Sequence, residues 1–411
     1  MRILYINHYA GSPRHGMEFR PYYLAREWVK AGHEVNMLAA DTSHLRQTNP
    51  ELKHKYQDED IDGIRYTWCR TPAYPGNGIK RVINIFSFLG KVMGLSGRYL
   101  REWKPDVVIA SSTYPLDTVP AAFIAGKTGA KLVYEVHDLW PLTPVEVGGM
   151  SPRHPFIRLM QWAEDFGYRK ANTVVSMLPC ARDYMMQHGM TTEKYLVIPN
   201  GVDVDEWQGA VAALPAEHVA RLDELKAQKR FLIGYAGGHG LANALDFLLD
   251  AAAQLKDAPV TFVLVGDGPD KAALQQRADE LALDNVVFLP SIPKRAVPAF
   301  LARMDSLFIG WRKLPIYRFG INPNKLFDYM MAGKPVIHSV EAGNDMVKDA
   351  GAGISVGAED PAAIAGAVRR MVALTPNERG RMGAAGRQYI LAHHDYRLLA
   401  RRFLQGVLER G

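Results

Sequence analysis

The sequence predicts an α/β protein made of two domains, each with a parallel sheet covered by helices on both faces. Short apolar runs typical of buried strands alternate with longer helix-like segments along both halves of the chain. The 411 residues are 48% hydrophobic and 22% charged, an ordinary globular composition that can fill two separate cores. Because ligands of such folds bind beyond the carboxyl ends of the strands, functional residues are expected in the loops that follow each strand.

The elements of the first half follow from this alternation. Strands are expected at 3–6, 34–38, 64–68, 107–110, 132–136, 173–176 and 196–198, and helices at 21–31, 79–103, 116–127 and 155–170. The loop at 7–20 contains Gly11 and many polar and basic groups, but it has no G-x-G-x-x-G sequence, so the dinucleotide fingerprint is absent. The loop suits an acceptor or a phosphate, and a plain connecting loop is the alternative.

The strand at 132–136 is followed by His137 and Asp138. A His-Asp pair just past a buried strand lies where chemistry occurs in doubly wound folds, and His137 could donate a hydrogen bond to a sugar hydroxyl. A structural histidine is the alternative.

The helix expected at 79–104 is amphipathic and basic. Its apolar residues are flanked by Lys80, Arg81, Lys91, Arg98, Arg101 and Lys104, with Glu102 as the only acid. Such a segment can lie on an anionic membrane surface. A core helix with a solvated basic edge is the alternative.

The second half begins after the turn signal at 199–203. Residues 204–229 have no strand signal, so we expect a first domain at 1–203, a linker at 204–229 and a second domain at 230–394. Strands are expected at 231–236, 260–265, 286–289, 306–309 and 335–337, and helices at 242–255, 294–304, 361–373 and 378–392. A last basic helix, at 395–411, is expected to cross back to the first domain.

Two strand-to-helix turns of the second half are rich in glycine. Gly237-Gly-His-Gly240 follows the first strand, and Gly266-Asp-Gly-Pro269 follows the next. Glycines at such turns let backbone N–H groups approach a diphosphate without a Cβ in the way.

The stretch 320–337 predicts a loop, a short helix and a strand. Asn322 is expected to cap the helix, Pro323 to take its first position and Gly333 to follow its end. Lys325 and Asp328 lie three apart and therefore share a helix face. A helix N-terminus with a lysine suits a phosphate, and the aspartate can accept hydrogen bonds from a sugar diol. An ordinary surface helix with a Lys/Asp pair is the alternative.

The totals exclude several classes of protein. Cys69 and Cys180 are too few for a disulfide framework or a zinc site, and both are expected to be reduced core residues. With no signal peptide and no run of 18 apolar residues, a cytoplasmic protein that does not span the membrane is expected. The net charge of +6 favours anionic partners. Asp203-Val-Asp205 has the form of a metal-binding DxD but lies in a turn, so no metal is expected there.

Four motifs, in this order, carry a resemblance to a known family. They are Pro-Asn-Gly-Val-Asp at 199–203, Tyr-Ala-Gly-Gly at 235–238, Val-Gly-Asp-Gly-Pro at 265–269 and Asn-Lys-Leu-Phe-Asp-Tyr-Met-Met-Ala-Gly-Lys-Pro-Val-Ile at 324–337. Together they resemble the retaining GT-B glycosyltransferases of family 4, over essentially the whole chain. Asn-His-Tyr-Ala-Gly-Ser at 7–12 and the segment 16–28 also look like the bacterial O-antigen and capsule members, including N-acetyl-L-fucosamine transferases.

The resemblance implies two Rossmann-like domains facing a central cleft, with the nucleotide sugar mainly on the second. Asp328 matches the second acid of the family's E-x7-E pattern, expected to hold the ribose, and Lys325 would meet the diphosphate. His137 matches the first-domain histidine expected near the donor sugar, so His137 and Lys325 are the expected catalytic residues. The other expected donor-binding residues are Gly11, Gly237, Gly238, His239, Gly266, Gly268, Ser291, Ile292, Ile321, Asn322 and Asn324.

The sequence departs from the family's pattern at two places. Gly320 stands where the first acid of E-x7-E is expected, and Gly238, His239 and Asn243 stand near the place of the usual basic pair. Lys325, with Arg312 or Lys313, would then carry more of the diphosphate charge.

By resemblance, the expected activity is transfer of a sugar such as N-acetyl-L-fucosamine from a UDP-linked donor, with retention and without a metal or other cofactor. The expected acceptor is a polyprenyl diphosphate-linked saccharide of surface polysaccharide synthesis, reached by peripheral binding to the inner face of the cytoplasmic membrane; no nucleic acid partner is expected. A nucleotide-sugar epimerase of the same fold and a non-catalytic donor-binding protein are the alternatives.

Overall fold

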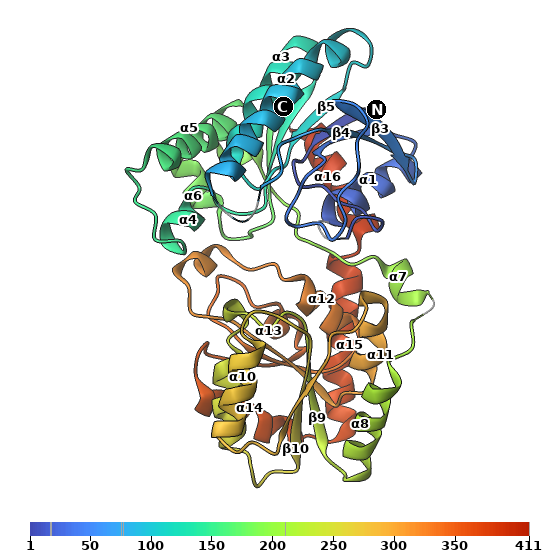
Figure 1. Ribbon diagram of the computed structural model, residues 1–411, viewed down its shortest axis with the longest axis vertical. Coiled ribbons are helices and arrows are strands. Elements are labelled where there is room, and N and C mark those ends of the chain that lie inside the picture. Colours follow the sequence, from blue (N-terminus) through green and yellow to red (C-terminus); the bar gives the residue numbers. More distant parts are fainter. Residues whose placement is uncertain (17–18, 75, 77, 210, 411) are drawn as a thin grey trace. The chain divides into compact units, whose positions relative to one another are not determined.

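The computed structural model describes residues 1–16, 19–74, 76, 78–209 and 211–410. Met17 and Glu18, which belong to the motif at 16–28, lie outside the described residues. The chain forms two compact units: Met1–Asn200 with Tyr396–Gly411, and Gly201–Asp395. Each unit is built on one sheet flanked by helices (Figure 1), so the prediction of two parallel-sheet α/β domains is confirmed.

In the described part of the first unit, eight strands form a sheet in the order β3-β4-β2-β1-β5-β6-β7-β8, with every pair parallel except β3 and β4. The strands are β1 Arg2–Ile6, β2 Glu34–Ala40, β3 Tyr56–Ile61, β4 Ile64–Cys69, β5 Val107–Ala110, β6 Lys131–Val136, β7 Thr173–Ser176 and β8 Tyr195–Val197. The α-helices are α1 Phe19–Lys30, α2 Ile79–Arg101, α3 Thr118–Thr128, α4 Leu142–Glu146, α5 Pro155–Lys170, α6 Arg182–Gln187 and α16 Tyr396–Glu409, with 3-10 turns at Pro115–Asp117 and Thr192–Lys194.

Strand β1 lies in the middle of this sheet and is apolar because both of its faces are covered. Ile3 and Tyr5 join a core with α1 and α16 on one side of the sheet. Helices α2, α3 and α5 pack beside one another on the other side (Figure 1). A strand buried on both faces reads as a continuous apolar run, which explains why β1 is evident in the sequence.

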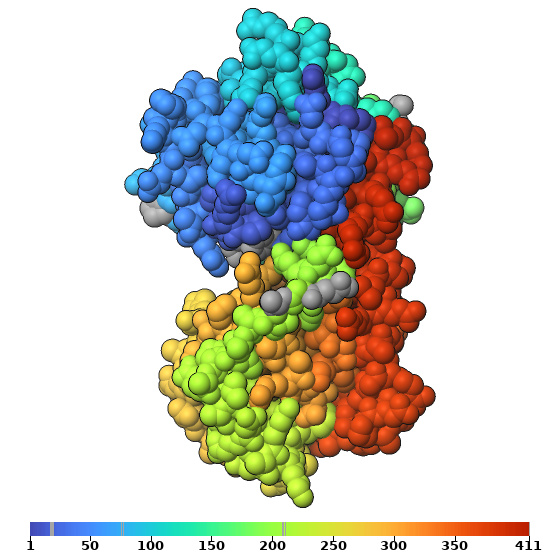
Figure 2. Space-filling model, turned by 90° about the vertical axis from the view of Figure 1, so that its right-hand side faces the viewer, coloured from blue at the N-terminus to red at the C-terminus, as the bar shows by residue number. Residues whose placement is uncertain are grey.

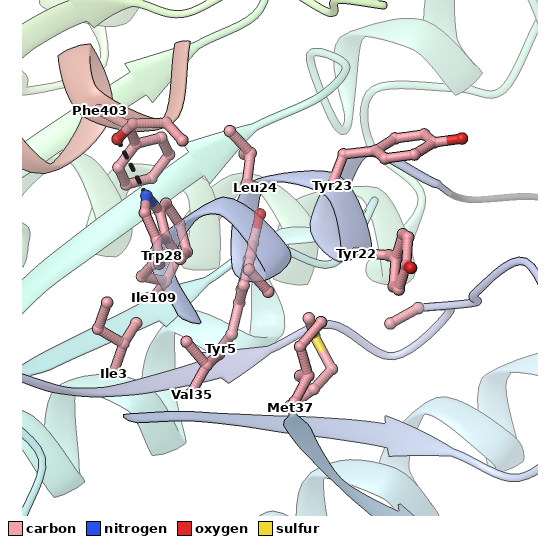
Figure 3. Close-up of a cluster of buried hydrophobic side chains, with 14 of the residues drawn as sticks. Ile3, Tyr5, Tyr22, Tyr23, Leu24, Trp28, Val35, Met37, Ile109 and Phe403 are labelled. Atoms are coloured by element: carbon pink, nitrogen blue, oxygen red, sulfur yellow. Dashed lines mark hydrogen bonds between the residues drawn. The ribbon is translucent and has the colours of Figure 1, made fainter. Parts of the chain in front are cut away.

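The C-terminal helix α16 completes the core of the first unit. The indole N–H of Trp28 on α1 donates a hydrogen bond to the carbonyl oxygen of Ala400 over 2.9 Å, and the rings of Trp28 and Phe403 lie 5.2 Å apart (Figure 3). Tyr23 stacks on Tyr396 with ring centroids 4.9 Å apart. The space-filling view shows this last segment, in red, lying against the blue N-terminal residues (Figure 2).

In the described part of the second unit, six strands form a fully parallel sheet in the order β11-β10-β9-β12-β13-β14. The strands are β9 Phe231–Ala236, β10 Val260–Val265, β11 Val286–Leu289, β12 Ser306–Gly310, β13 Val336–Ser339 and β14 Gly353–Val356. The α-helices are α7 Val204–Gln208, α8 Ala216–Ala227, α9 Leu245–Ala253, α10 Lys271–Glu280, α11 Val297–Ala302, α12 Asn324–Met331, α13 Met346–Ala350, α14 Pro361–Ala373 and α15 Pro376–His393, with 3-10 turns at Leu241–Asn243, Lys294–Ala296 and Pro315–Phe319. Successive residues of β9 face two cores, one on each side of the sheet.

Four features of the structure differ from the sequence-based expectations. Cys69 is buried as expected, but Cys180, expected to be a core residue, is exposed. Strand β3 was not expected because its sequence, YQDEDI, is polar; it pairs antiparallel with β4 at the edge of the sheet, where one side meets solvent. Strand β14 was not expected either; it is four residues long and lies at the edge of its sheet. The segment 204–229, expected to be a linker, holds α7 and α8 and belongs to the second unit, since Leu222 and Leu225 are buried in its core.

Candidate functional site

The two glycine-rich loops of the second unit pack directly on each other. They follow β9 and β10, which are parallel neighbours, so both loops lie at the same edge of the sheet. The amide of Gly237 donates a hydrogen bond to the carbonyl oxygen of Val265 over 3.0 Å. The amide of His239 donates one to the carbonyl oxygen of Asp267 over 2.8 Å. A Cβ on Gly266 would lie 1.9 Å from the carbonyl oxygen of Gly237, and a Cβ on Gly268 would lie 2.4 Å from that of His239.

These contacts explain the glycines in a way that could not be read from the sequence. Gly266 and Gly268 are needed because no side chain fits between the loops. The amides of Gly237 and His239 already donate to the neighbouring loop, so other backbone groups of this edge must meet any phosphate.

Lys325 reaches from the first turn of α12 to the glycine loop that follows β9. Its ammonium donates to the hydroxyl of Tyr235 over 2.6 Å and to Oδ1 of Asn243 over 2.8 Å. Gly237 leaves the room for it, because a Cβ there would lie 2.5 Å from Cε of Lys325. Burial lowers the pKa of Lys325 from 10.5 to about 7, since among the described residues it has neutral partners and no ion pair with a carboxylate.

The alternative cations are already neutralised. Arg312 lies 2.8 Å from a carboxylate oxygen of Asp246 and 3.7 Å from one of Glu359. Lys313 lies 2.8 Å from a carboxylate oxygen of Glu341. The expectation that these two would share the diphosphate charge therefore has no support in the geometry.

His239 lies fully buried beside Lys325. Its ring stacks on that of Tyr235 with centroids 5.8 Å apart, and within the described part of the chain neither ring nitrogen has a hydrogen-bond partner. Burial, and then the charges of Lys271 and Lys325, lower the pKa of His239 to about 4, so the ring is neutral at pH 7.

Helix α12 is fixed to the end of β9 by Tyr329, whose hydroxyl accepts a hydrogen bond from the amide of Ala236 over 2.7 Å. Asp328 lies on the same helix, one turn after Lys325. Burial raises the pKa of Asp328 to about 6, although the charge of Lys294 and a hydrogen bond from Trp207 act to lower it. Lys325 and Asp328 thus lie on one rigid element.

The start of α12 corrects one expectation. The helix begins at Asn324 with Pro323 in the capping position and no side-chain cap, so the prediction that Asn322 is the cap is wrong. Pro323 is extended, with φ −82° and ψ 122°, which places Asn322 outside the helix. Asn324 itself is exposed.

The residues before α12 are also held by neighbours. The amide of Ile321 donates to Oδ1 of Asn344 over 2.7 Å, and the carbonyl of Ile321 accepts from Asn344 over 3.1 Å. Gly320 has φ +103° and ψ 165°, a conformation close to glycine-only. An acid at this position would be strained in this backbone conformation.

The remaining expected residues lie on loops. Ser291 is exposed in the loop after β11, and Ile292 is half-buried against the core of the second unit. In the first unit, Gly11 is buried in the loop after β1, where its carbonyl accepts a hydrogen bond from the hydroxyl of Tyr66 over 2.9 Å.

His137 lies at the carboxyl end of β6 in the first unit. Its Nε2 is 2.9 Å from the hydroxyl of Ser111 and 3.6 Å from a carboxylate oxygen of Glu135. The sequence analysis did not identify Ser111 or Glu135. Tyr235, Asn243 and Lys271 were not proposed as site residues either.

Two groups of residues bear on metal binding. Asp203 caps α7 by accepting a hydrogen bond from the amide of Asp205 over 3.0 Å, so the DxD sequence has a structural use. Ligand atoms of Glu164, Asp165 and His188 lie within 4.8 Å of one another. Glu164 already accepts hydrogen bonds from Tyr168, Tyr184 and Gln161, and burial raises its pKa to about 8.

A span long and apolar enough to cross a membrane is absent from the described helices.

Comparison with known proteins gives a consistent assignment for the two halves. Residues 15–201 match a family model described as a glycosyl transferase 4-like domain, and residues 230–373 match one described as glycosyl transferases group 1. WcaI of Escherichia coli K12, a glycosyl transferase assigned to colanic acid biosynthesis, is 24% identical over 323 residues, which are 77% of this chain and 78% of that protein.

Solved structures share the fold. A sucrose-phosphate synthase from Thermosynechococcus elongatus superposes with a TM-score of 0.71 at 18% identity, over 98% of this chain and 97% of that one. The Anabaena protein HepE in complex with UDP superposes with a TM-score of 0.68 at 17% identity, over the full length of both chains.

Proposed function

The chain belongs to the GT-B glycosyltransferases, and from this premise we propose that it transfers a sugar from a UDP-linked donor to a lipid-linked saccharide, with retention at the anomeric carbon. The observation that carries the proposal is Lys325, a half-buried ammonium with neutral partners, held against the glycine loop that follows β9 at the carboxyl edge of a parallel sheet. That edge is where nucleotides bind in doubly wound folds.

In the proposed reaction, the bond between the anomeric carbon and the diphosphate oxygen breaks as the acceptor hydroxyl forms a new bond to the same carbon. The acceptor proton passes to the departing diphosphate, and Lys325 stabilises the negative charge that develops there. Asp328 accepts hydrogen bonds from the ribose, and His137 binds a sugar hydroxyl. Because Lys325 supplies the positive charge, no metal is required, and EDTA should leave turnover unchanged.

The choice of UDP is supported by HepE, a structure of the same fold that was solved with UDP. The motifs at 7–12 and 16–28, which resemble N-acetyl-L-fucosamine transferases, make UDP-N-acetyl-L-fucosamine the first donor to test. The relative assigned to colanic acid biosynthesis supports a role in surface polysaccharide synthesis, of which O-antigen or capsule is the form we propose.

A lipid-linked acceptor, met at the inner face of the cytoplasmic membrane, is supported by the outer face of α2. Ile79, Ile83, Phe86 and Met93 follow helical spacing along it and are 77%, 53%, 47% and 39% exposed. Lys80 is exposed beside them, and Lys91 is half-buried. Arg98 is less available, because it lies 2.8 Å from a carboxylate oxygen of Asp58. Apolar side chains flanked by lysines are typical of a helix that lies on an anionic bilayer.

The activity is tested by incubating the protein with UDP-sugars, with and without a polyprenyl diphosphate-linked saccharide. Release of UDP that depends on the acceptor is expected. An epimerised donor would instead indicate a nucleotide-sugar epimerase, and donor binding without turnover would indicate a non-catalytic partner.

The membrane contact is tested separately with vesicles that contain anionic lipid. The double variant Ile83→Asp/Phe86→Asp should lose sedimentation with the vesicles while keeping UDP binding. Leu241→Asp, on an exposed apolar residue of the second unit, is the matched control. Equal sedimentation of all three proteins would refute the role of α2.

A further inference from the structure

We propose that Glu135 is a positioning residue that, through Ser111, keeps a proton on Nε2 of His137 and so fixes the tautomer of the ring that meets its ligand. This inference rests on the proposed function only in the identity of that ligand, a sugar hydroxyl. The arrangement of the three side chains is independent of it.

The carboxylate of Glu135 is fully buried at the end of β6 and is held from three other elements. Its Oε1 accepts from Nε and Nη2 of Arg20 on α1, over 3.0 and 2.8 Å. Its Oε2 accepts from the hydroxyl of Tyr5 on β1 over 2.5 Å and from that of Ser111, just after β5, over 2.6 Å. Burial acts to raise the pKa of Glu135, but Arg20, His137 and Ser111 hold it well below its usual range. The group is therefore an ionised carboxylate that only accepts hydrogen bonds.

The direction of each hydrogen bond follows from the number of protons. Ser111 has one hydroxyl hydrogen, and its short contact to an ionised carboxylate oxygen fixes that hydrogen on the side of Glu135. Toward His137 the Ser111 oxygen can then only accept, and the 2.9 Å contact requires that Nε2 of His137 carries the proton. Nδ1 is therefore the nitrogen that accepts in the neutral ring and donates in the imidazolium.

The carboxyl groups of Glu135, Asp117 and Asp138 all interact with His137, and Arg20 is the opposing cation behind Glu135. Burial raises the pKa of Asp117 to about 6 and that of Asp138 by a smaller amount, so Glu135 is the most strongly ionised of the three.

A purely structural role for Glu135, neutralising the buried Arg20, has to be separated from this one. Removing Glu135 would leave Arg20 buried without a counter-charge and could unfold the unit. The informative variant is therefore Ser111→Ala, which keeps the ion pair of Glu135 with Arg20 and removes the hydroxyl that links Glu135 to His137 and accepts from Nδ2 of Asn7. Ser112→Ala is the matched control, because its hydroxyl accepts from the amide of His8 over 3.1 Å, whereas the serine hydroxyl that contacts His137 is that of Ser111.

The test is a pH titration of 15N-histidine-labelled protein by NMR, with the His137 signals assigned from the variant His137→Gln. In the wild type and in Ser112→Ala, the neutral ring should carry its proton on Nε2. In Ser111→Ala the Nδ1–H tautomer should become populated, and the pKa of His137 should fall, because the imidazolium donates a stronger hydrogen bond to Ser111 than the neutral ring does. An unchanged tautomer and pKa in Ser111→Ala would overturn the proposal.

A second measurement links the tautomer to turnover. Ser111→Ala should lower kcat and shift its pH profile in the direction of the NMR pKa, with little change in donor affinity, whereas Ser112→Ala should retain the wild-type profile. If no donor is turned over, the NMR result still decides the proposal while the proposed function fails. If turnover is present and Ser111→Ala keeps the wild-type profile, the proposed function stands and the role of Glu135 is refuted.

Discussion

Donor binding should take up a proton, and Lys325 is the reason. In the unliganded protein its pKa is lowered from 10.5 to about 7, which corresponds to about 5 kcal/mol at about 1.36 kcal/mol per pKa unit. A diphosphate beside the ammonium restores the charged form, so the pKa of Lys325 rises in the complex. Above pH 7 the free protein has lost this proton and must regain it on binding.

The expected proton uptake on UDP binding follows from the free pKa. It is about 0.9 at pH 8, about 0.5 at pH 7 and about 0.1 at pH 6, and the affinity falls about tenfold for each pH unit above 7. Calorimetric titrations of UDP at pH 8 in buffers of different ionisation enthalpy measure the uptake directly. At that pH neither His239, with a pKa of about 4, nor the free diphosphate contributes much.

Lys325→Met tests the assignment. It should weaken UDP binding at pH 7 by about 10- to 100-fold, the range of a hydrogen bond to a charged group, and should abolish the proton uptake. Lys313→Met is the matched control, because that lysine is paired with Glu341 and should change neither quantity. Tight binding by the wild type at pH 8 with no proton uptake would refute the role given to Lys325.

Three further changes have defined outcomes. Gly320→Glu restores the acid of the family's pattern at a residue with φ +103°. It should lower the free energy of unfolding, measured in urea, by about 1 to 3 kcal/mol and should not raise turnover. A variant that is as stable as the wild type and more active would contradict the strain argument. Gly266→Ala should separate the two glycine loops, because its Cβ would lie 1.9 Å from the carbonyl of Gly237, and should abolish UDP binding in calorimetry. Gly240→Ala, with open space around it, is expected to bind normally, and equal binding by both would count against the loop geometry. Phe403→Ala should lower the free energy of unfolding of the first unit by about 3 to 5 kcal/mol, measured by chemical denaturation; a loss below about 1 kcal/mol would show that α16 adds little to that core.

The buried strands and the long helices could be predicted from sequence because their periodicity is set by burial. β1 and β9 read as apolar runs, since helices cover both sheet faces. Strands β3 and β14 could not, because an edge strand meets solvent and its composition resembles that of a loop.

The candidate site was predictable in part for a similar reason. Lys325 and Asp328 could be placed on one helix face by spacing alone. Glu135 lies on β6 and Ser111 directly follows β5, 24 residues earlier, so their contact depends on the pairing of β5 with β6. No local pattern marks that contact, and the same holds for the contact of Lys325 with Tyr235, 90 residues away.

The place of α16 has a consequence for how the protein is made. The first unit consists of residues 1–200 and 396–411, so its core cannot close until the ribosome has synthesised residues 396–411. Until then the side of α1 that carries Trp28 and Tyr23 is uncovered, while residues 201–395 can already fold as a continuous segment. A fragment cut at residue 200 should therefore aggregate, and one in which 396–411 is joined to it by a flexible linker should remain in solution.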